Sequence, residues 1–154
     1  MTRSKRMQPV LRIAEMREQA AVKELGNAQR YLKEQEDRLA ELQGYQAEYA
    51  RNFQDLGSKG ISAARFQELQ RFMANLTQAI EQQQQMVHNA ARACVQKKQL
   101  WQQAYGKSKS LDKVVERYSE QELYEQGQRE QKAADEMAQH GDRARLGKDD
   151  DSGT

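Results

Sequence analysis

The stretch from Leu42 to Leu76 reads LQGYQAEYARNFQDL (42–56), GSKGIS (57–62) and AARFQELQRFMANL (63–76). The outer two segments have helical patterns, and the middle one has the composition of a turn. Gly57 stands where a left-handed residue often follows the end of a helix, and Ser62 can cap the helix that follows. Ile61 and Phe66 have the spacing of a hydrophobic staple across that cap. The stretch therefore predicts two helices folded back on each other.

The composition argues against an ordinary globular core. Mean hydropathy is −1.09, and charged residues make up 31% of the 154 residues while aromatic residues make up only 6%. A chain this polar forms either an extended coiled coil or a disordered segment. The net charge of +2 and the single cysteine favour neither nucleic-acid binding nor a disulfide framework. No apolar run approaches the roughly 20 residues that span a bilayer, so we expect a cytoplasmic protein without membrane insertion.

A sustained heptad repeat favours the coiled coil over disorder. Apolar residues occupy eleven of fourteen positions at alternating spacings of three and four in the first arm, and thirteen of sixteen in the second. Random polar sequence does not keep such a phase, so the repeat predicts a two-helix coiled coil. The first-arm positions are Leu11, Ala14, Glu18, Ala21, Leu25, Ala28, Leu32, Gln35, Leu39, Leu42, Gln46, Tyr49, Phe53 and Leu56. The second-arm positions are Phe66, Leu69, Met73, Leu76, Ile80, Gln83, Val87, Ala90, Cys94, Lys97, Trp101, Ala104, Ser108, Leu111, Val115 and Tyr118.

The position of the turn determines which residues of the two arms face each other. With a turn centred on Ser58 and Lys59, the numbers of facing residues should sum to about 118. Gln35 and Gln83 then meet in the middle of the arms, where a buried polar pair specifies the register at a cost in stability. The other expected neighbours are Phe53 with Phe66, Tyr49 with Leu69, Tyr45 with Phe72, Ala28 with Ala90, and Glu18 with Lys97 within one turn.

We expect an all-α protein, a long antiparallel helical hairpin whose C-terminal helix overhangs its partner. Pro9 suits the first turn of a helix, so the first helix is expected to begin there. Leu111 would face residue 7, so residues 112–138 would extend past the first helix. The expected segments are a flexible basic start (1–8), a first helix (9–56), a turn (57–62), a second helix (63–138) and a disordered tail (139–154).

Sequence motifs for catalysis, metal binding or cofactor binding are absent. The chain has no phosphate-binding loop, no dinucleotide fingerprint and no cluster of cysteine and histidine. Cys94 and Trp101 are expected to pack in the seam, and His88 is expected on the surface. Asp149, Asp150 and Asp151 are interpreted as a solvated charge run rather than a cation site. We therefore expect a protein that is not an enzyme and that binds no cofactor.

One cluster of apolar side chains lies outside the predicted seam. Tyr45 and Phe72 each stand one residue away from a seam position, so a two-stranded coil cannot cover them fully. Together with Leu42, Tyr49, Leu76 and Ala79 they would form a half-exposed patch near the turn. Such a patch on a polar protein is typical of a contact site, and packing of the aromatic rings on each other is the alternative.

These residues together resemble the FliJ family, the small coiled-coil proteins of the bacterial flagellar type III export apparatus. The resemblance covers residues 10–138 and rests on Leu42, Tyr45-Gln46-x-Glu48-Tyr49, Gly60-Ile61, Arg65, Phe72, Leu76-x-x-Ala79-Ile80 and Trp101. It implies a hairpin like the central stalk of rotary ATPases. The implied partners are the hexameric flagellar export ATPase, into which the stalk inserts, the export-gate membrane protein and the export chaperones. The implied gate contact comprises Leu42, Tyr45, Tyr49, Phe72, Leu76 and Ala79, and Arg38 stands where the family has glutamine.

Basic residues gather at the terminal end of the expected hairpin. Arg3, Lys5, Arg6, Arg12 and Arg17 would face acidic groups in the ring of the export ATPase, and solvation at a free end is the alternative. Two other functions compete with the stalk, namely a generic coiled-coil scaffold or homodimeric adaptor, and a nucleic-acid-binding coiled coil. Acidic residues nearly balance the basic ones, which disfavours nucleic acid.

Overall fold

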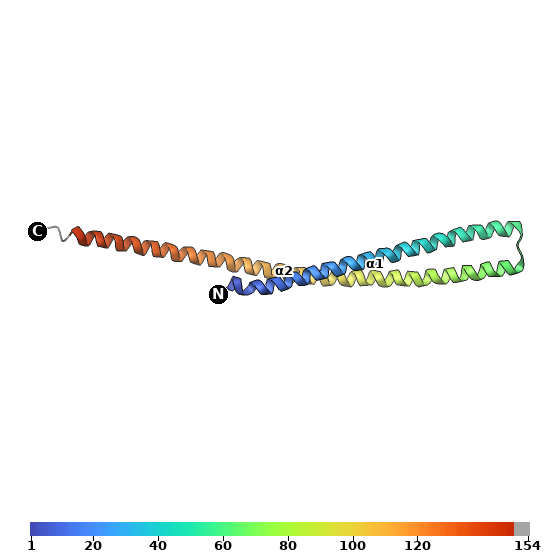
Figure 1. The fold of residues 1–154 in the computed structure, drawn as a ribbon, viewed down its shortest axis with the longest axis horizontal. Coiled ribbons are helices and arrows are strands. Elements are labelled where there is room, and N and C mark those ends of the chain that lie inside the picture. The colour runs from blue at the N-terminus through green and yellow to red at the C-terminus, as the bar shows by residue number, and fades with distance from the viewer. Residues whose placement is uncertain (150–154) are drawn as a thin grey trace. The chain divides into compact units, whose positions relative to one another are not determined.

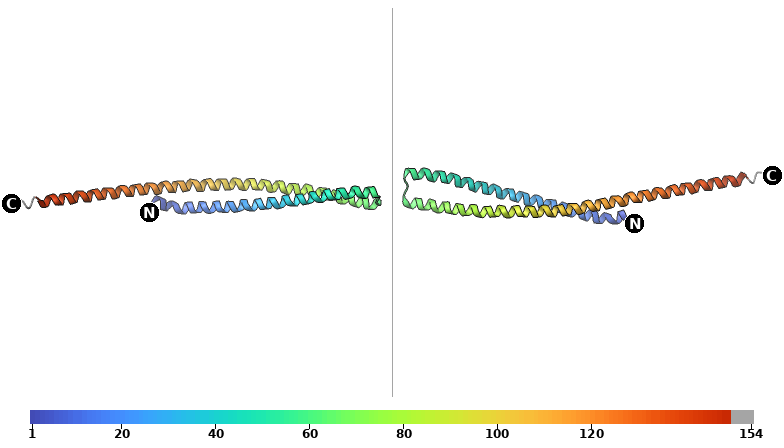
Figure 2. Two further views of the ribbon diagram at one scale, coloured as in Figure 1. Left: turned by 90° about the horizontal axis from the view of Figure 1, so that it is seen from above. Right: turned by 180° about the vertical axis from the view of Figure 1, so that it is seen from behind.

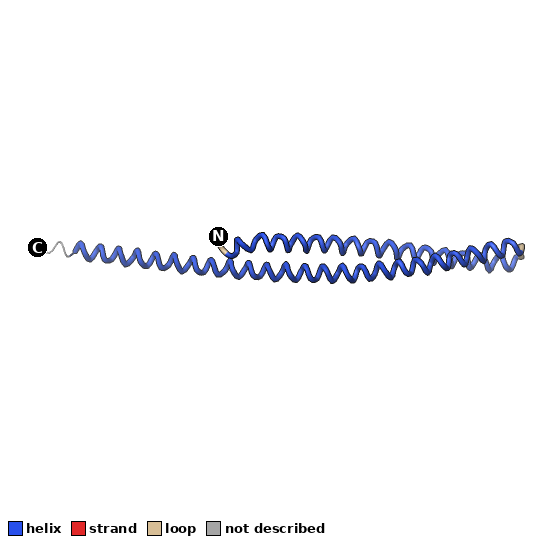
Figure 3. Tube along the Cα trace, turned by 90° about the horizontal axis from the view of Figure 1, so that it is seen from below, coloured by secondary structure: helices blue, strands red, loops and turns tan. Residues whose placement is uncertain are grey.

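The computed structural model describes the backbone of residues 1–149 and the side chains of residues 1–147. Two helices make up almost all of it, α1 (Arg3–Lys59) and α2 (Ala63–Asp149) (Figure 1). The connection between them is the short tan segment at one end of the tube in Figure 3. The described residues include no strand. The all-α helical hairpin predicted from the sequence is confirmed.

The chain divides into two compact units, which we describe separately. The hairpin unit comprises Met16–Tyr105, and the terminal unit comprises Met1–Glu15 together with Gly106–Thr154. Within each unit a segment of α1 lies beside a segment of α2 and runs in the opposite direction (Figures 1 and 2).

In the hairpin unit, the buried residues are those of the heptad seam. Gln35, Leu76, Ile80, Gln83 and Ala90 are buried. Most other seam positions are half-buried, whereas the residues between them are largely exposed. Each helix thus buries one narrow stripe, as expected when two helices pack without a third element to cover their flanks.

The polar pair predicted within this seam is present. Gln83 Nε2 donates one hydrogen bond to Gln35 Oε1 at 2.8 Å and a second to the Gln35 backbone carbonyl at 3.0 Å. Both side chains are buried, so the bonds replace water for groups that would otherwise be costly to bury.

The turn lies later in the chain than the sequence suggested. α1 continues through Gly57 and ends at Lys59, and Gly60 is the residue with a left-handed backbone, at φ 78°. The expectation that Gly57 ends the helix is therefore wrong, because glycine lowers helix propensity without forcing an end. The predicted cap of α2 is confirmed, since Arg65 N donates to Ser62 Oγ at 3.3 Å.

The register of the two helices follows the prediction in the middle of the seam. Gln35 and Gln83, whose residue numbers sum to 118, are hydrogen-bonded, and Phe53 and Phe66 meet as expected, with ring centroids 5.2 Å apart. Two side chains on the flanks have other partners than expected. The ring of Phe72 packs against Tyr49 rather than Tyr45, and the ion pair of Lys97, at 2.9 Å, is with Glu24 rather than Glu18.

In the terminal unit, α1 begins at Arg3, ahead of Pro9. Thr2 caps this start, because its Oγ1 accepts a hydrogen bond from Lys5 N at 3.4 Å and its carbonyl accepts one from Arg6 N at 3.1 Å. The segment expected to be a flexible start is therefore helical from Arg3 onward. Pro9 was the predicted start of the helix, whereas the structure has Thr2 as the capping residue.

The two helices of the terminal unit remain in contact further along α2 than expected. Leu11, Ala14, Ser108 and Val115 are buried. Half-buried positions continue on α2 as far as Glu122. The expectation that α2 is unpaired from residue 112 is wrong, because α1 starts at Arg3, ahead of Pro9.

Beyond Glu122, α2 is exposed throughout the described side chains of residues 123–147. We call residues 123–147 the overhang. The helix continues to Asp149, where a disordered tail was expected from residue 139. Gly141 and Gly147 each cost a helix only about 1 kcal/mol relative to alanine, and no proline follows them. Residues 150–154 of the expected tail, including Asp150 and Asp151, lie outside the described residues.

Candidate partner-binding surfaces

The first candidate surface is a group of aromatic side chains in the hairpin unit, close to the turn. Tyr45, Tyr49 and Phe72 are 46%, 40% and 43% exposed. We call these three residues the aromatic face. α1 positions the two tyrosines one helical turn apart, and α2 positions the phenylalanine opposite them. A two-helix coil has no further layer to cover rings on its flank, so they stay accessible.

The rings of the aromatic face are held by specific contacts. Tyr49 and Phe72 pack edge to face, with centroids 4.8 Å apart and an angle of 63° between the ring planes. Tyr45 Oη donates a hydrogen bond to Glu41 Oε1 at 3.0 Å. That bond to a carboxylate raises the pKa of the Tyr45 hydroxyl. The face thus presents one ring pair linking the helices and one separate tyrosine.

The other residues predicted for the gate contact have a different environment. Leu76 is buried, and Leu42 and Ala79 are half-buried. Leu42 and Leu76 are seam positions, so their side chains contribute little exposed surface to a contact. The structure therefore places all six predicted residues in the hairpin unit, with three of them exposed as aromatic rings.

A shallow groove near the turn was not foreseen from the sequence. It is lined by Ala50, Phe53, Gln54, Gln70 and Met73. Phe53, Phe66 and Met73 had been placed in the seam, where the heptad pattern gives no sign that side chains remain partly open to solvent. Phe66 is exposed at the next groove, which Ile61 also lines.

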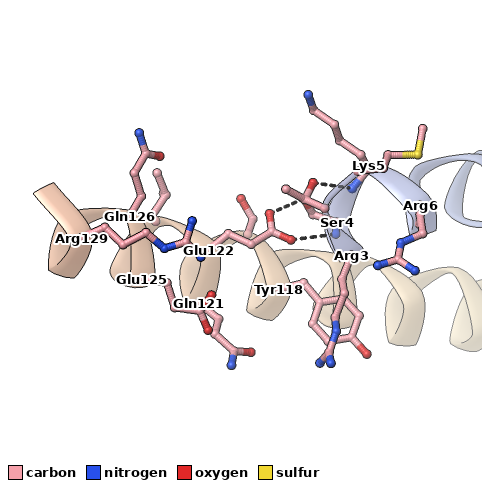
Figure 4. A pocket seen from close by; sticks show the side chains of 14 residues that line it. Arg3, Ser4, Lys5, Arg6, Tyr118, Gln121, Glu122, Glu125, Gln126 and Arg129 are labelled. Carbon is pink, nitrogen blue, oxygen red and sulfur yellow. Dashed lines mark hydrogen bonds between the residues drawn. The ribbon is translucent and has the colours of Figure 1, made fainter.

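The second candidate surface lies in the terminal unit, where the start of α1 meets α2 (Figure 4). Arg3, Lys5 and Arg6 line a groove together with Glu122 and Arg129 of α2. The Arg3 guanidinium lies 5.9 Å from the centre of the Tyr118 ring, a distance that permits a cation–π interaction. Three of the predicted basic residues are thus brought together by the folded start of α1.

The other two predicted basic residues are not part of this groove. Arg12 is exposed further along α1, and Arg17 is exposed in the hairpin unit. The groove contains an acidic residue that the sequence argument did not consider. Glu122 Oε1 accepts a hydrogen bond from Ser4 N at 3.0 Å, and Glu122 Oε2 accepts one from Ser4 Oγ at 2.6 Å. A bond between residues so far apart in the chain leaves no periodic signal in the sequence.

Both surfaces present side chains that can contact another macromolecule. Over the residues described, no group of three or more acidic, histidine or cysteine side chains is arranged to hold a metal ion. Neither helix contains, in its described part, a segment long and apolar enough to span a bilayer. The accessible chemistry consists of aromatic rings near the turn and charged groups at the terminal end.

The family model described as Flagellar FliJ protein matches residues 3–146. The chain belongs to the FliJ family. A Flagellar FliJ protein from Escherichia coli (strain K12) is 28% identical over 127 residues, which cover 82% of this chain and 86% of that protein. No solved structure matches. Membership in the FliJ family makes the chain a component of flagellar protein export.

Proposed function

We propose that this protein is a non-enzymatic coupling component of flagellar type III export, whose aromatic face binds the export-gate membrane protein. The observation that carries the proposal is the exposure of Tyr45, Tyr49 and Phe72 on an otherwise polar coiled coil. Half-exposed aromatic rings gain contact area on binding without the entropy loss of long flexible side chains. Leu42, Leu76 and Ala79 complete the proposed gate contact.

The terminal unit supplies the second contact in this proposal. The stalk inserts into the hexameric export ATPase and presents Arg3, Lys5, Arg6 and Arg12 of the terminal unit to acidic groups of the ring. Arg17, which belongs to the hairpin unit, is the fifth basic residue proposed for this contact. Separate surfaces for the gate and the ATPase would let one protein link the two. The proposal also includes escort of export chaperones and a cytoplasmic location at the flagellar base, peripheral to the inner membrane.

Replacing Tyr45 with alanine tests the gate contact most cleanly. Tyr45 bonds to Glu41 on its own helix and lies outside the seam, so its loss should leave the melting temperature nearly unchanged. A hot-spot aromatic contributes about 2 kcal/mol or more to binding, so affinity for the cytoplasmic part of the gate should fall about thirtyfold. Titration calorimetry measures the affinity, and circular dichroism measures the melt.

The matched control is Tyr31→Ala, which removes another half-exposed tyrosine from α1, at 47% exposure. This variant should bind the gate normally. Both variants should still stimulate the export ATPase, because that contact is assigned to the terminal unit. Unchanged gate binding in both Tyr45→Ala and Phe72→Ala would contradict the proposed face. Failure of the wild-type protein to bind gate or ATPase, together with a stable dimer in light scattering, would favour a scaffold or homodimeric adaptor instead.

A further inference from the structure

The first turns of α1 contain a built-in weak point at Pro9. Proline has no backbone N–H, so it cannot donate to the carbonyl of Lys5, and its ring crowds that same carbonyl. A proline inside a helix is therefore costly, whereas a proline in the first turn is not. The segment ahead of Pro9 nevertheless remains helical from Arg3. Some interaction outside the helix ladder must stabilise it.

Glu122 of α2 provides that interaction. The first N–H groups of a helix have no partner within the helix, and Ser4 N is one of them. Its bond to Glu122 Oε1 and the shorter bond from Ser4 Oγ to Oε2 join the start of α1 to the other helix at both carboxylate oxygens (Figure 4). A negative charge at this end also interacts favourably with the helix dipole.

The same few residues contain two alternative starts for α1. With Thr2 as the cap, its side chain and carbonyl accept from Lys5 N and Arg6 N, and Pro9 is inside the helix. With the start at Pro9, the proline occupies a first-turn position where its missing N–H has no consequence. The early start gains the Glu122 bonds, and the late start avoids the strain at proline.

We propose that residues 1–8 act as a latch that alternates between a closed helical state clamped by Glu122 and an open state in which α1 begins at Pro9. In the closed state Arg3 lies over Tyr118 and the three basic side chains line the groove. In the open state these cations leave α2 on a flexible arm. The latch is a property of the terminal unit alone and does not depend on the identity of any partner.

Charge controls the latch through the carboxyl group of Glu122. Its bonds to the Ser4 side chain and backbone lower its pKa below the ordinary value of 4.5. A lowered pKa means that the clamp contributes fully above that ordinary value and is lost as pH falls through the lowered one. The latch is therefore closed at neutral pH. The charged or titratable groups lining the same groove are the Met1 amine ahead of α1, Arg3, Lys5 and Arg6 from α1, and Tyr118, Glu125 and Arg129 from α2.

Solution NMR of the full chain tests the latch at the amide proton of Ser4. In the wild type this proton should be protected from exchange, and its chemical shift should follow the Glu122 titration in acid. Glu122→Ala should speed its exchange about tenfold, since hydrogen bonds to charged groups are the stronger ones. Residues 3–8 should lose their helical carbon shifts, while residues 10–15 should keep them.

Two further variants separate a latch from ordinary fraying. Glu125→Ala removes a carboxylate one turn away that lines the same groove, and it should leave Ser4 unaffected. Pro9→Ala removes the weak point, so the double variant Pro9→Ala with Glu122→Ala should keep residues 3–8 helical. Helical shifts at residues 3–8 in Glu122→Ala alone, or their loss in the double variant, would overturn the proposal.

Discussion

At the scale of single residues, two buried hydrogen-bond donors in the hairpin unit differ in whether they have a partner. Gln83 donates two hydrogen bonds to Gln35 within the buried seam. Trp101 Nε1 is also buried, yet it has no hydrogen-bond partner among the described residues. The free energy of unfolding should therefore fall when Gln83 is made apolar and should change little when Trp101 loses its N–H group.

The glutamine pair should show strong coupling between its two members. Gln83→Leu leaves Gln35 Oε1 buried without a donor and should lower the free energy of unfolding by about 1–3 kcal/mol. Gln35→Leu should cost less, because Gln83 keeps its bond to the backbone carbonyl of residue 35. Replacing both with leucine should raise stability above the wild type while loosening the register. Urea denaturation of the four proteins measures the coupling, and additive effects would show that the pair does not act as a unit.

Loss of register in the double leucine variant can be detected by cross-linking. Cysteines at positions 35 and 83, in a background where Cys94 is replaced by serine, should form a disulfide within one chain. In the leucine variant, cysteine pairs placed one heptad out of register should cross-link more readily than in the wild type. Disulfides that form only between chains would contradict the hairpin.

Trp101→Phe should leave stability within about 1 kcal/mol of the wild type. The smaller ring loses apolar contact, but the change also removes a buried donor whose lack of a partner costs about 1–3 kcal/mol. Trp101→Ala should cost clearly more, because it also removes the ring that packs against Tyr105 at 5.5 Å. Thermal melts by circular dichroism compare the two, and equal destabilisation would mean that the indole N–H has a partner in solution.

At the scale of the elements, the helices were predictable and their ends were not. The heptad pattern repeats along the chain, so each apolar position adds to the evidence for a helix. A helix end has no such repetition, and the sequence prediction rested on a single glycine, Gly57. Only the backbone shows that Gly60 is left-handed. The Glu122 clamp escaped prediction for a related reason, since the expected start of α1 at Pro9 left Glu122 in an unpaired segment.

The two turn glycines should respond oppositely to alanine. Gly57→Ala should raise the free energy of unfolding by about 0.5–1 kcal/mol, because the position is helical and an added methyl group would meet no atom within 4 Å. Gly60→Ala should lower it by about 1–2 kcal/mol, because alanine resists a φ of 78°. Urea midpoints measure both. If Gly57→Ala lowered the free energy of unfolding and Gly60→Ala raised it, the left-handed residue would be at position 57.

At the scale of the whole molecule, protection from solvent should vary along α2. Ile80 is buried and Val87 half-buried in the hairpin unit, whereas residues 123–147 are exposed. A single helix without packing partners is only marginally stable in water. We expect hydrogen exchange in the overhang to be orders of magnitude faster than around Ile80.

Exchange of the overhang can be followed by mass spectrometry of peptides from the intact chain. Gly127→Ala should slow exchange locally, by about fivefold for a helix gain of about 1 kcal/mol. The same change should leave peptides of the hairpin unit unaltered. Equal protection of the overhang and the Ile80 region in a dilute sample would mean that another chain covers residues 123–147.

The connection from Gly60 to Ser62 also has a kinetic consequence. Phe53 and Phe66 lie close in sequence across it, whereas Gln35 and Gln83 are 48 residues apart and Ser4 and Glu122 are 118 apart. Loop closure costs more entropy for longer loops, so contacts beside the turn should form first and shorten the effective loop for each later pair. Pairing of the two helices would then begin at the turn and progress away from it. Gly60→Ala, which strains the turn, should therefore slow refolding. Glu122→Ala, which removes the bonds to Ser4, should chiefly raise the unfolding rate.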